Sequence, residues 1–231
     1  MASMIASKAT HPKFGVDYLD ACALHDTLLD DTVLATFAFG SDAPDHDDPR
    51  YLRVPLQPDS GNPLEVWRAT GPVTCGRDGP IAWSSDGHLS FGVIEVDESE
   101  VGLEAAAASA YAQAIAFVRA SGTPHLLRIW NYLDAITLGE GDAERYRQFC
   151  VGRARGMGDF DAARLPAASA IGRCDDRRVV QVYWLAAHTL GTPVENPRQV
   201  SAYRYPRQYG KQAPSFARAM LPPRGSNMPL L

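Results

Sequence analysis

The chain has 231 residues, of which 45% are hydrophobic and 21% are charged, so it can bury the core of one large or two small domains. Its net charge of −5, with no long basic run in the body of the chain, argues against nucleic acid as the main partner. No apolar run approaches the roughly 20 residues of a membrane helix, and the N-terminus lacks the apolar core of a signal peptide, so we expect a cytoplasmic protein.

Cysteine spacing and acidic clusters give no metal signal. The four cysteines are Cys22, Cys75, Cys150 and Cys174. They form no C-x-x-C pair, which argues against zinc and a disulfide framework and favours buried thiols over a catalytic one. The aspartates and His46 of the loop 41–50 are metal-ligand types, but prolines interrupt them and favour a solvated loop. We predict no metal site.

Apolar runs separated by loops rich in Asp, Pro and Gly predict short strands in the N-terminal third. These runs are Val33–Phe39, Tyr51–Pro55 and Leu64–Arg68. A hairpin follows, because Ile81–Ser84 and His88–Val96 flank the dipeptide Asp86-Gly87.

The clearest helix is predicted over Glu100–Ala120, with Asp97 or Ser99 as its cap and Gly122 at its end. Its apolar stripe is Leu103, Ala107, Ala110, Ala114 and Phe117. The small residues in the middle of this stripe allow close packing on a sheet.

The remaining elements complete a mixed order. They are a strand over His125–Leu133, a helix over Ala143–Arg155 stopped by Gly156, and strands over Ala168–Gly172, Arg178–Ala187 and Gln199–Tyr205. The order from Ile81 to Tyr205 is thus β-β-α-β-α-β-β. Layer rules place this order in the α+β class, with both helices on one face of a mixed sheet.

The second helix carries arginines beside its apolar face. On a helical period this face holds Tyr146, Phe149, Cys150 and Arg153, flanked by Arg145 and Arg147. An arginine on an apolar face needs an anionic partner, because burying its charge alone costs several kcal/mol. The partner is either an internal carboxylate or a ligand, and both interpretations remain open.

The last segment of the chain is basic. Residues 196–231 contain six Lys and Arg and no Asp or Glu, a net charge of +6 beside −11 for residues 1–195. Within it, Ser201–Gly210 holds three tyrosines and two arginines, the groups that bind a carboxylate on a small ring. If this run is extended, Ser201, Tyr203 and Tyr205 share one face up to Pro206. The alternative is a strand edge with a solvated rim.

Several motifs carry a family resemblance. They are Arg128–Leu133 (RIWNYL), Glu144–Arg153 (ERYRQFCVGR), Ser201–Gly210 (SAYRYPRQYG) and Pro214–Ala219 (PSFARA). These motifs resemble the chorismatase family, also labelled pteridine-dependent dioxygenase-like, and are most similar to bacterial 3-hydroxybenzoate/4-hydroxybenzoate synthases of the xanthomonadin pathway. The resemblance implies a pyruvate-releasing lyase that converts chorismate to 3-hydroxybenzoate, with or without the ubiquinone precursor 4-hydroxybenzoate, and that uses no cofactor.

The resemblance also implies an architecture. It suggests a strand-rich extension over residues 1–78, a RidA-like module over 79–205, and the opening of a second RidA-like module over 206–231 whose remainder is missing. Family members continue beyond this point, and their catalytic glutamate, the general acid, lies there. The chain alone is therefore expected to be inactive. It is also expected either to form a homotrimer or to use an intramolecular second module.

Four residues are assigned to the substrate by the resemblance, and none to catalysis. Tyr205 and Arg218 match the family's contacts to a substrate carboxylate, and Arg147 and Arg153 are expected to form a second clamp. The choice among Arg145, Arg147 and Arg153 stays open by one helical turn. Two alternatives also stay open: a RidA-like imine or enamine deaminase, and a non-catalytic module that binds an aromatic acid.

Overall fold

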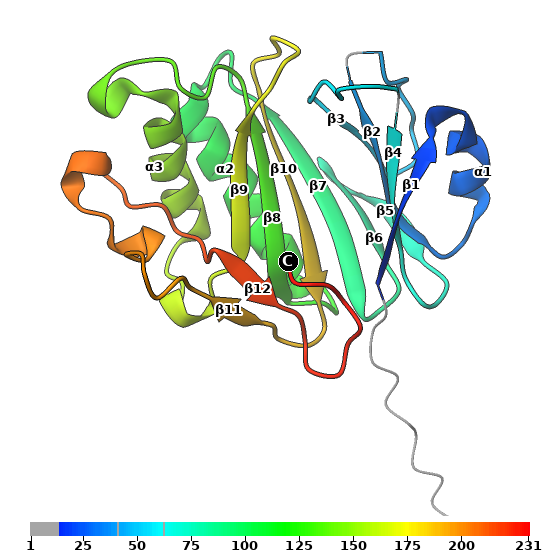
Figure 1. Cartoon of the computed structure of the whole chain (residues 1–231). Coiled ribbons are helices and arrows are strands. Elements are labelled where there is room, and N and C mark those ends of the chain that lie inside the picture. The colour runs from blue at the N-terminus through cyan, green and yellow to red at the C-terminus, as the bar shows by residue number, and fades with distance from the viewer. Residues whose placement is uncertain (1–13, 41, 62) are drawn as a thin grey trace, which may run out of the picture.

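Three layers form the fold: a four-stranded sheet, a six-stranded sheet and a pair of helices (Figure 1). The computed structural model describes residues 14–40, 42–61 and 63–231. One core lies between the two sheets, and a second core lies between the six-stranded sheet and the helices. Among the described residues, no helix is both long and apolar enough to cross a membrane.

The four-stranded sheet has the order β1-β4-β2-β3 and contains the three strands predicted near the N-terminus. Its elements, with the short helix beside it, are β1 (Gly15–Asp20), α1 (Leu24–Leu29), β2 (Val33–Phe39), β3 (Tyr51–Val54) and β4 (Pro63–Arg68). The predictions of β2, β3 and β4 are confirmed, whereas β1 and α1 are additional. The side chains of β1 are mostly exposed, so they carry no alternating apolar pattern to predict it.

The six-stranded sheet has the order β5-β6-β7-β10-β8-β9. Its strands are β5 (Thr74–Asp78), β6 (Ile81–Ser85), β7 (Leu89–Asp97), β8 (His125–Leu133), β9 (Ala167–Gly172) and β10 (Val179–Ala187). The hairpin of β6 and β7 is confirmed, with Gly87 at φ 85° as the turn requires. Strands β9 and β10 follow each other in the chain but are not neighbours, because β8 lies between them and pairs with both.

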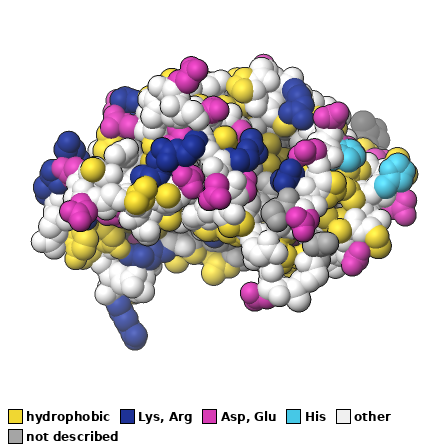
Figure 2. Space-filling view, turned by 90° about the horizontal axis from the view of Figure 1, so that it is seen from above, with side chains coloured by type: hydrophobic (Ala, Val, Ile, Leu, Met, Phe, Trp, Pro, Cys, Tyr) yellow, Lys and Arg dark blue, Asp and Glu magenta, His cyan; other side chains and the backbone are white. Residues whose placement is uncertain are grey.

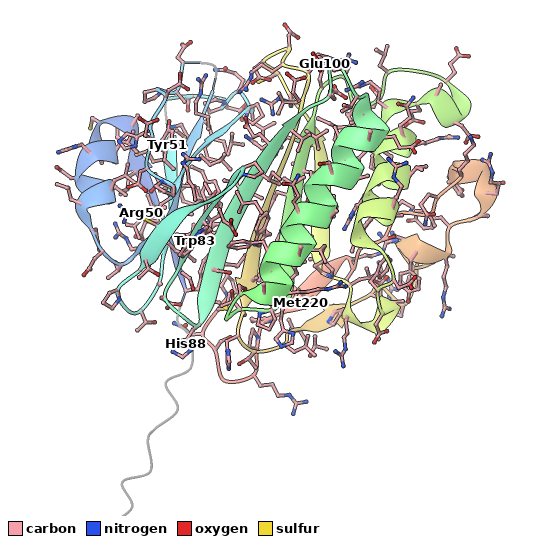
Figure 3. The ribbon with its side chains drawn as sticks, turned by 180° about the vertical axis from the view of Figure 1, so that it is seen from behind. Arg50, Tyr51, Trp83, His88, Glu100 and Met220 are labelled. Carbon is pink, nitrogen blue, oxygen red and sulfur yellow. The ribbon has the colours of Figure 1, made fainter. Side chains whose placement is uncertain are left out.

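Helices α2 (Leu103–Ala120) and α3 (Arg145–Met157) lie on one face of the six-stranded sheet, as predicted. Helix α2 starts later than expected, and Glu100 lies in the turn before it (Figure 3). Gly156 does not stop α3, because it lies within the helix and faces α2. A Cβ at this position would approach the backbone oxygen of Ala108 to 2.4 Å.

The C-terminal segment contradicts one prediction. Gln199–Tyr205 is not a strand, since it contains a 3-10 helix, η4 (Ala202–Arg204), and a second one follows, η5 (Arg207–Tyr209). The short sheet below the main one pairs β11 (Thr192–Val194) with β12 (Ala219–Leu221). Tertiary contacts outweigh the local β pattern here, because the segment packs along α3 and the bridge to the edge strand β9 is made by Ala217 instead.

The remaining described helical turns are also short. They are η1 (Ala21–Ala23), η2 (Gly141–Ala143) and η3 (Ala162–Arg164).

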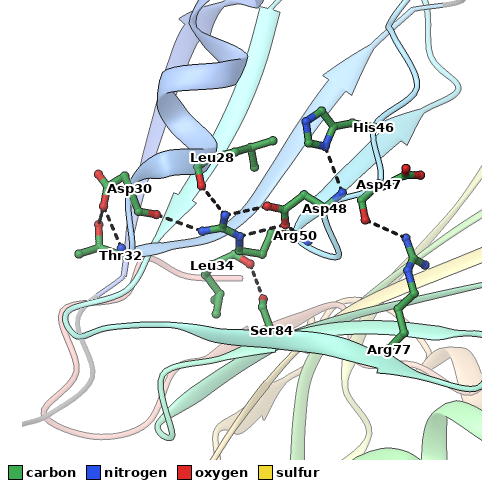
Figure 4. Close-up of polar contacts among 10 residues, drawn as sticks. All are labelled: Leu28, Asp30, Thr32, Leu34, His46, Asp47, Asp48, Arg50, Arg77 and Ser84. Carbon is green, nitrogen blue, oxygen red and sulfur yellow. Dashed lines mark hydrogen bonds and ion pairs between the residues drawn. The ribbon is translucent and has the colours of Figure 1, made fainter.

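The acidic loop 42–50 has a structural role. Asp48 pairs with the buried Arg50 at 2.7 Å, and Arg50 also donates to the backbone oxygens of Leu28 and Asp30 (Figure 4). This network ties the loop to the end of α1. Among the described residues, no group of His, Cys, Asp and Glu could hold a metal ion.

Candidate functional site

The three arginines of α3 have different surroundings. Arg145 is buried and forms an ion pair with the buried Glu98, while its Nε donates to the backbone oxygen of Asp134 at 2.8 Å. Arg178 also reaches Glu98, at 3.2 Å. The internal-carboxylate interpretation therefore holds for Arg145, which is a structural residue.

Arg147 is half-buried and already has a partner. Its Nε donates to the carboxylate of Glu144 at 3.0 Å, one helical turn away. Its aliphatic stem lies against Gly210, where an added Cβ would be 3.6 Å from the Arg147 Cγ. The residue thus helps to seat the C-terminal segment on α3, and its charge is balanced within the helix.

Arg153 is the buried arginine of α3 that lacks a carboxylate. Arg153 is only 4% exposed, and its Cζ lies 5.1 Å from the ring centroid of Tyr111 on α2. Within the described part of the chain, Nε and Nη2 of Arg153 have no hydrogen-bond partner. These two buried donors are unpaired, so Arg153 is the arginine of α3 that the geometry favours as a candidate site residue.

Tyr205 and Arg218 are brought together by the fold although thirteen residues separate them. The Nη2 of Arg218 donates to the hydroxyl of Tyr205 at 2.9 Å and to the backbone oxygen of Val200 at 3.0 Å. The Nε of Arg218 is buried and has no partner among the described residues. Arg218 therefore also presents an unused guanidinium donor.

A pocket of about 480 Å³ lies between α3 and the open edge of β9. It is lined by Ile136, Thr137, Glu144, Tyr146, Phe149, Arg153, Ala168, Ser169, Ala170 and Phe216. Phe216, which lines the pocket, precedes Arg218 by two residues. Arg153 and Tyr205 both lie close enough to Tyr146 to shift the pKa of its phenol, Arg153 downward and Tyr205 upward. The pocket, Arg153 and the Tyr205–Arg218 pair thus belong to one region.

The phenol of Tyr146 is neutral in this pocket. Burial raises its pKa far above the usual value, and the neighbouring Cys150 and Tyr205 raise it further. A neutral phenol can donate a hydrogen bond to a carboxylate without repelling it. Burial also raises the pKa of Cys150, so its thiol is not activated as a nucleophile.

Two sequence predictions about this region are wrong in detail. Cys150 is buried, but Cys22, Cys75 and Cys174 are exposed thiols. The face that Ser201, Tyr203 and Tyr205 would share in an extended run does not form, because Ala202–Arg204 is a 3-10 helix and Tyr203 packs against the core under the helices. The Tyr205 ring lies 5.6 Å from that of Tyr209.

Some basic side chains of the C-terminal segment pair with an acidic residue of the protein itself. Arg207 forms two hydrogen bonds to Asp142, at 3.0 and 2.6 Å, and Lys211 lies 3.9 Å from the same carboxylate. The face seen from above likewise mixes dark blue basic and magenta acidic side chains (Figure 2). Among the basic side chains of this segment, Arg218 has a buried donor, its Nε, without a partner in the described part of the chain.

Some residues around Arg153 were not predicted from the sequence. Ser169 of β9 and Phe216 of the C-terminal segment line the same pocket as Arg153. Tyr111 of α2 lies against the Arg153 guanidinium and is not part of the pocket lining. A signal existed for Tyr111, because a single large ring interrupts an alanine-rich helix face.

Fold and pocket together define an α+β protein with an aromatic-lined pocket that contains a buried arginine. A family model described as "Chorismatase FkbO/Hyg5-like, N-terminal" matches residues 65–186. The chain is 38% identical over 169 residues to a chorismatase of Streptomyces hygroscopicus, across 71% of this chain and 48% of that protein. It is 35% identical over 171 residues to a 3-hydroxybenzoate synthase of the same organism, with the same coverage of 71% and 48%.

A solved structure agrees with these sequence similarities. The crystal structure of a chorismatase superposes with a TM-score of 0.80 at 33% identity, covering 94% of this chain and 67% of that chain. The chain therefore belongs to the chorismatase FkbO/Hyg5-like family. It spans about half the length of the curated relatives it matches, 48% in each of the two described above.

Proposed function

We propose that this protein is a chorismatase that removes pyruvate from chorismate and forms 3-hydroxybenzoate. The observation that supports this most is the buried guanidinium of Arg153, which lines an aromatic pocket with two donors unpaired. The second unpaired guanidinium donor, that of Arg218, lies two residues along the chain from Phe216 of the same pocket. The names of the curated relatives, chorismatase and 3-hydroxybenzoate synthase, support the same chemistry.

The chemistry of chorismate fits this arrangement. Chorismate is a cyclohexadiene with one carboxylate on the ring and a second on an enolpyruvyl ether, so it calls for two cationic clamps and an apolar wall. Arg153 would hold one carboxylate. Arg218, with Tyr205 fixing its orientation, would hold the other. Phe149 and Phe216 would exclude water from the ring.

The reaction also needs a general acid. A glutamic acid would protonate the enol methylene, so that the ether carbon becomes an oxocarbenium ion, and water would add to this carbon to form a hemiketal. Collapse of the hemiketal would break the bond between the former ether carbon and the ring oxygen, releasing pyruvate and returning the proton to the carboxylate. Loss of the remaining ring hydroxyl as water would then make the ring aromatic and give 3-hydroxybenzoate. Glu144 lines the pocket, but its carboxylate already accepts from Arg147. We therefore keep the assignment of the acid to a part of the family's fold outside residues 1–231.

Finer features of this proposal come from the resemblance. They include 4-hydroxybenzoate as a second product, a place in xanthomonadin biosynthesis, and the RidA-like character of the module at 79–205. The division into an extension at 1–78 and a second module that opens at 206 stays a prediction, as do the cytoplasmic location and the homotrimer or intramolecular module. Arg147 stays a predicted substrate contact, although its pairing with Glu144 favours Arg153.

The test is to express the protein from its complete open reading frame and to incubate it with chorismate. We expect pyruvate and 3-hydroxybenzoate in equal amounts, measured by a coupled dehydrogenase assay and by chromatography. Release of neither product would overturn the assignment. Release of ammonia from short 2-imino acids in its place would identify a deaminase, and tight binding of 3-hydroxybenzoate without turnover would identify a binding module.

A further inference from the structure

Buried arginines in this fold have two kinds of partner. Arg145 pairs with Glu98, and Arg173 pairs with Asp175 at 2.7 Å, so each of these cations faces a carboxylate. Arg153 is as buried as they are, yet its guanidinium faces the ring of Tyr111 at 5.1 Å. Arg50, a further buried arginine, likewise pairs with a carboxylate, that of Asp48 at 2.7 Å. The ring of Tyr111 takes the place that a carboxylate holds at these three sites.

We propose that Tyr111 is the positioning residue of the anion site, a neutral partner that holds the Arg153 guanidinium in place and leaves its charge and its donors for the ligand. This inference rests on the proposed function and deepens it. The face of an aromatic ring attracts a cation through its quadrupole, whereas a carboxylate would neutralise the cation and accept its N–H groups. The observed consequence is that Nε and Nη2 of Arg153 have no partner in the described part of the chain.

The ring of Tyr111 is itself rigidly held. Its hydroxyl donates to Oδ1 of Asn131 on β8 at 2.6 Å, and the Asn131 amide donates to the backbone oxygen of Ser169 on β9 at 2.8 Å. Phe149 packs edge-on against the same ring, with 6.2 Å between centroids. This chain of contacts runs from α2 through the sheet to the pocket wall, because Ser169 lines the pocket.

The phenol of Tyr111 stays uncharged, because complete burial raises its pKa. The residue of α2 that faces the Arg153 guanidinium, Tyr111, is thus uncharged. An incoming carboxylate then meets an unneutralised guanidinium in a region with little water, where a charge-assisted hydrogen bond is strong.

The experiment changes the electrostatic quadrupole of the ring at position 111 while keeping the shape of the ring. Tyr111→Phe retains the ring, pentafluorophenylalanine at position 111 inverts the quadrupole at nearly constant size, and Tyr111→Leu removes the ring. We measure the Kd of 3-hydroxybenzoate by calorimetry, the KM and kcat for chorismate, and the melting temperature of each variant.

We expect Tyr111→Phe to bind within about twofold of the wild type, and the fluorinated variant to bind about tenfold more weakly at a similar melting temperature, from the usual range of cation–π strengths. KM should follow Kd, with kcat changed less. The matched control is pentafluorophenylalanine at Phe91, a fully buried ring between the two sheets, which should leave Kd unchanged.

The outcomes separate the two proposals. All variants are made in the protein expressed from its complete open reading frame, as in the test of the proposed function. If this wild-type protein neither binds 3-hydroxybenzoate nor converts chorismate, the proposed function is overturned, and this inference with it. A wild-type protein that does both, together with an unchanged Kd in the fluorinated variant, overturns the role of Tyr111 alone. If Tyr111→Leu does not fold, the comparison of phenylalanine with its fluorinated form still decides the question.

Discussion

At the scale of single residues, the partner of each buried guanidinium decides what it can do. Arg145 is held by Glu98 and contributes to the fold, whereas Arg153 and Arg218 keep donors without partners among the described residues. Leaving a charged donor unpaired is costly, so such groups are found where a ligand completes them. Arginine therefore has a structural role at position 145, and positions 153 and 218 stay the candidates for ligand binding.

Arg218→Ala is expected to weaken chorismate binding by at least about tenfold, because losing a charge-assisted hydrogen bond typically costs 1.5–3 kcal/mol. The substitution also removes the donor that orients the Tyr205 hydroxyl. The measurement is the KM for chorismate. Arg198→Ala, an exposed change in the same basic segment, is the matched control. Equal KM values in the two variants would refute the assigned role of Arg218.

Arg153→Met and Arg145→Met should have opposite effects on folding. Removing Arg153 relieves a buried cation that has no carboxylate partner, so we expect the free energy of unfolding to stay equal or rise while ligand binding is lost. Removing Arg145 leaves the buried Glu98 with the half-exposed Arg178 as its remaining cationic partner, which should cost about 2–3 kcal/mol of unfolding free energy. Urea unfolding of both variants provides the measurement, and a larger loss for Arg153→Met would contradict the proposed arrangement.

At the scale of elements, small residues set the distance between α2 and α3. Helix α2 presents alanines, and α3 presents Gly152 and Gly156 to the same contact. A Cβ at Gly152 would lie 2.1 Å from the backbone oxygen of Glu104. The close approach matters for the site, because it brings Tyr111 of α2 within reach of Arg153 of α3.

Gly152→Ala should therefore force the helices apart, at a cost of about 1–3 kcal/mol for overpacking. Ligand affinity should also fall, because the distance between Arg153 and Tyr111 increases. Gly122→Ala is the matched control, since nothing lies within 4 Å of a Cβ at that exposed position and its effect should stay within about 0.5 kcal/mol. Chemical unfolding of the two variants tests this, and similar unfolding free energies would show that the contact is not tight.

At the scale of the whole molecule, hydrogen bonds from β10 and from the loop between β9 and β10 connect the six-stranded sheet to the segment at the end of β3. The backbone nitrogen of Cys174 donates to the backbone oxygen of Pro55 at 3.1 Å, and Gln181 donates to that of Arg53, also at 3.1 Å. The loop is held by Asp175, which forms two hydrogen bonds to the buried Arg173. These hydrogen bonds lower the pKa of Asp175.

A pKa lowered by folding stabilises the folded state above the unfolded pKa of about 3.9. The contribution of Asp175 to the free energy of unfolding should therefore be present at neutral pH. It should be lost as the pH falls below about 4 and passes through the pKa of Asp175 in the folded state. Asp175→Asn should be less stable than the wild type at pH 7, and the difference should shrink at pH 3. Asp59→Asn, at an exposed loop position, is the control for unfolding curves at the two pH values. A difference independent of pH would contradict the assignment.

Both edges of the six-stranded sheet are open to further pairing. β5 pairs only with β6 among the described strands, and β9 has Ala217 as its single bridge on the outer side. Open edges favour association, so we expect either a homotrimer or coverage by a second module. Light scattering of the 231-residue chain should give a mass above its monomer value of 25.1 kDa. A compact monomer would contradict this expectation.

Sequence alone determined the elements whose signals are local. The strand His125–Leu133 is predicted with its observed ends, and the hairpin at Asp86-Gly87 and the two helices are predicted in the right order. Each rests on a periodic apolar pattern bounded by turn residues, which needs no distant partner to be recognised. The motifs also identified the family that the later comparisons confirm.

Only the tertiary structure decided which residues meet. Gln199–Tyr205 has a strand-like pattern but folds as a coil and a 3-10 turn, because it packs along α3. Helical spacing placed Arg145, Arg147 and Arg153 near one face, and the pairing of Arg147 with Glu144 is local as well. The partners of Arg145 and Arg153, Glu98 and Tyr111, come from distant segments of the chain. Burial and pairing depend on contacts between distant segments, and a local pattern contains no information about those contacts.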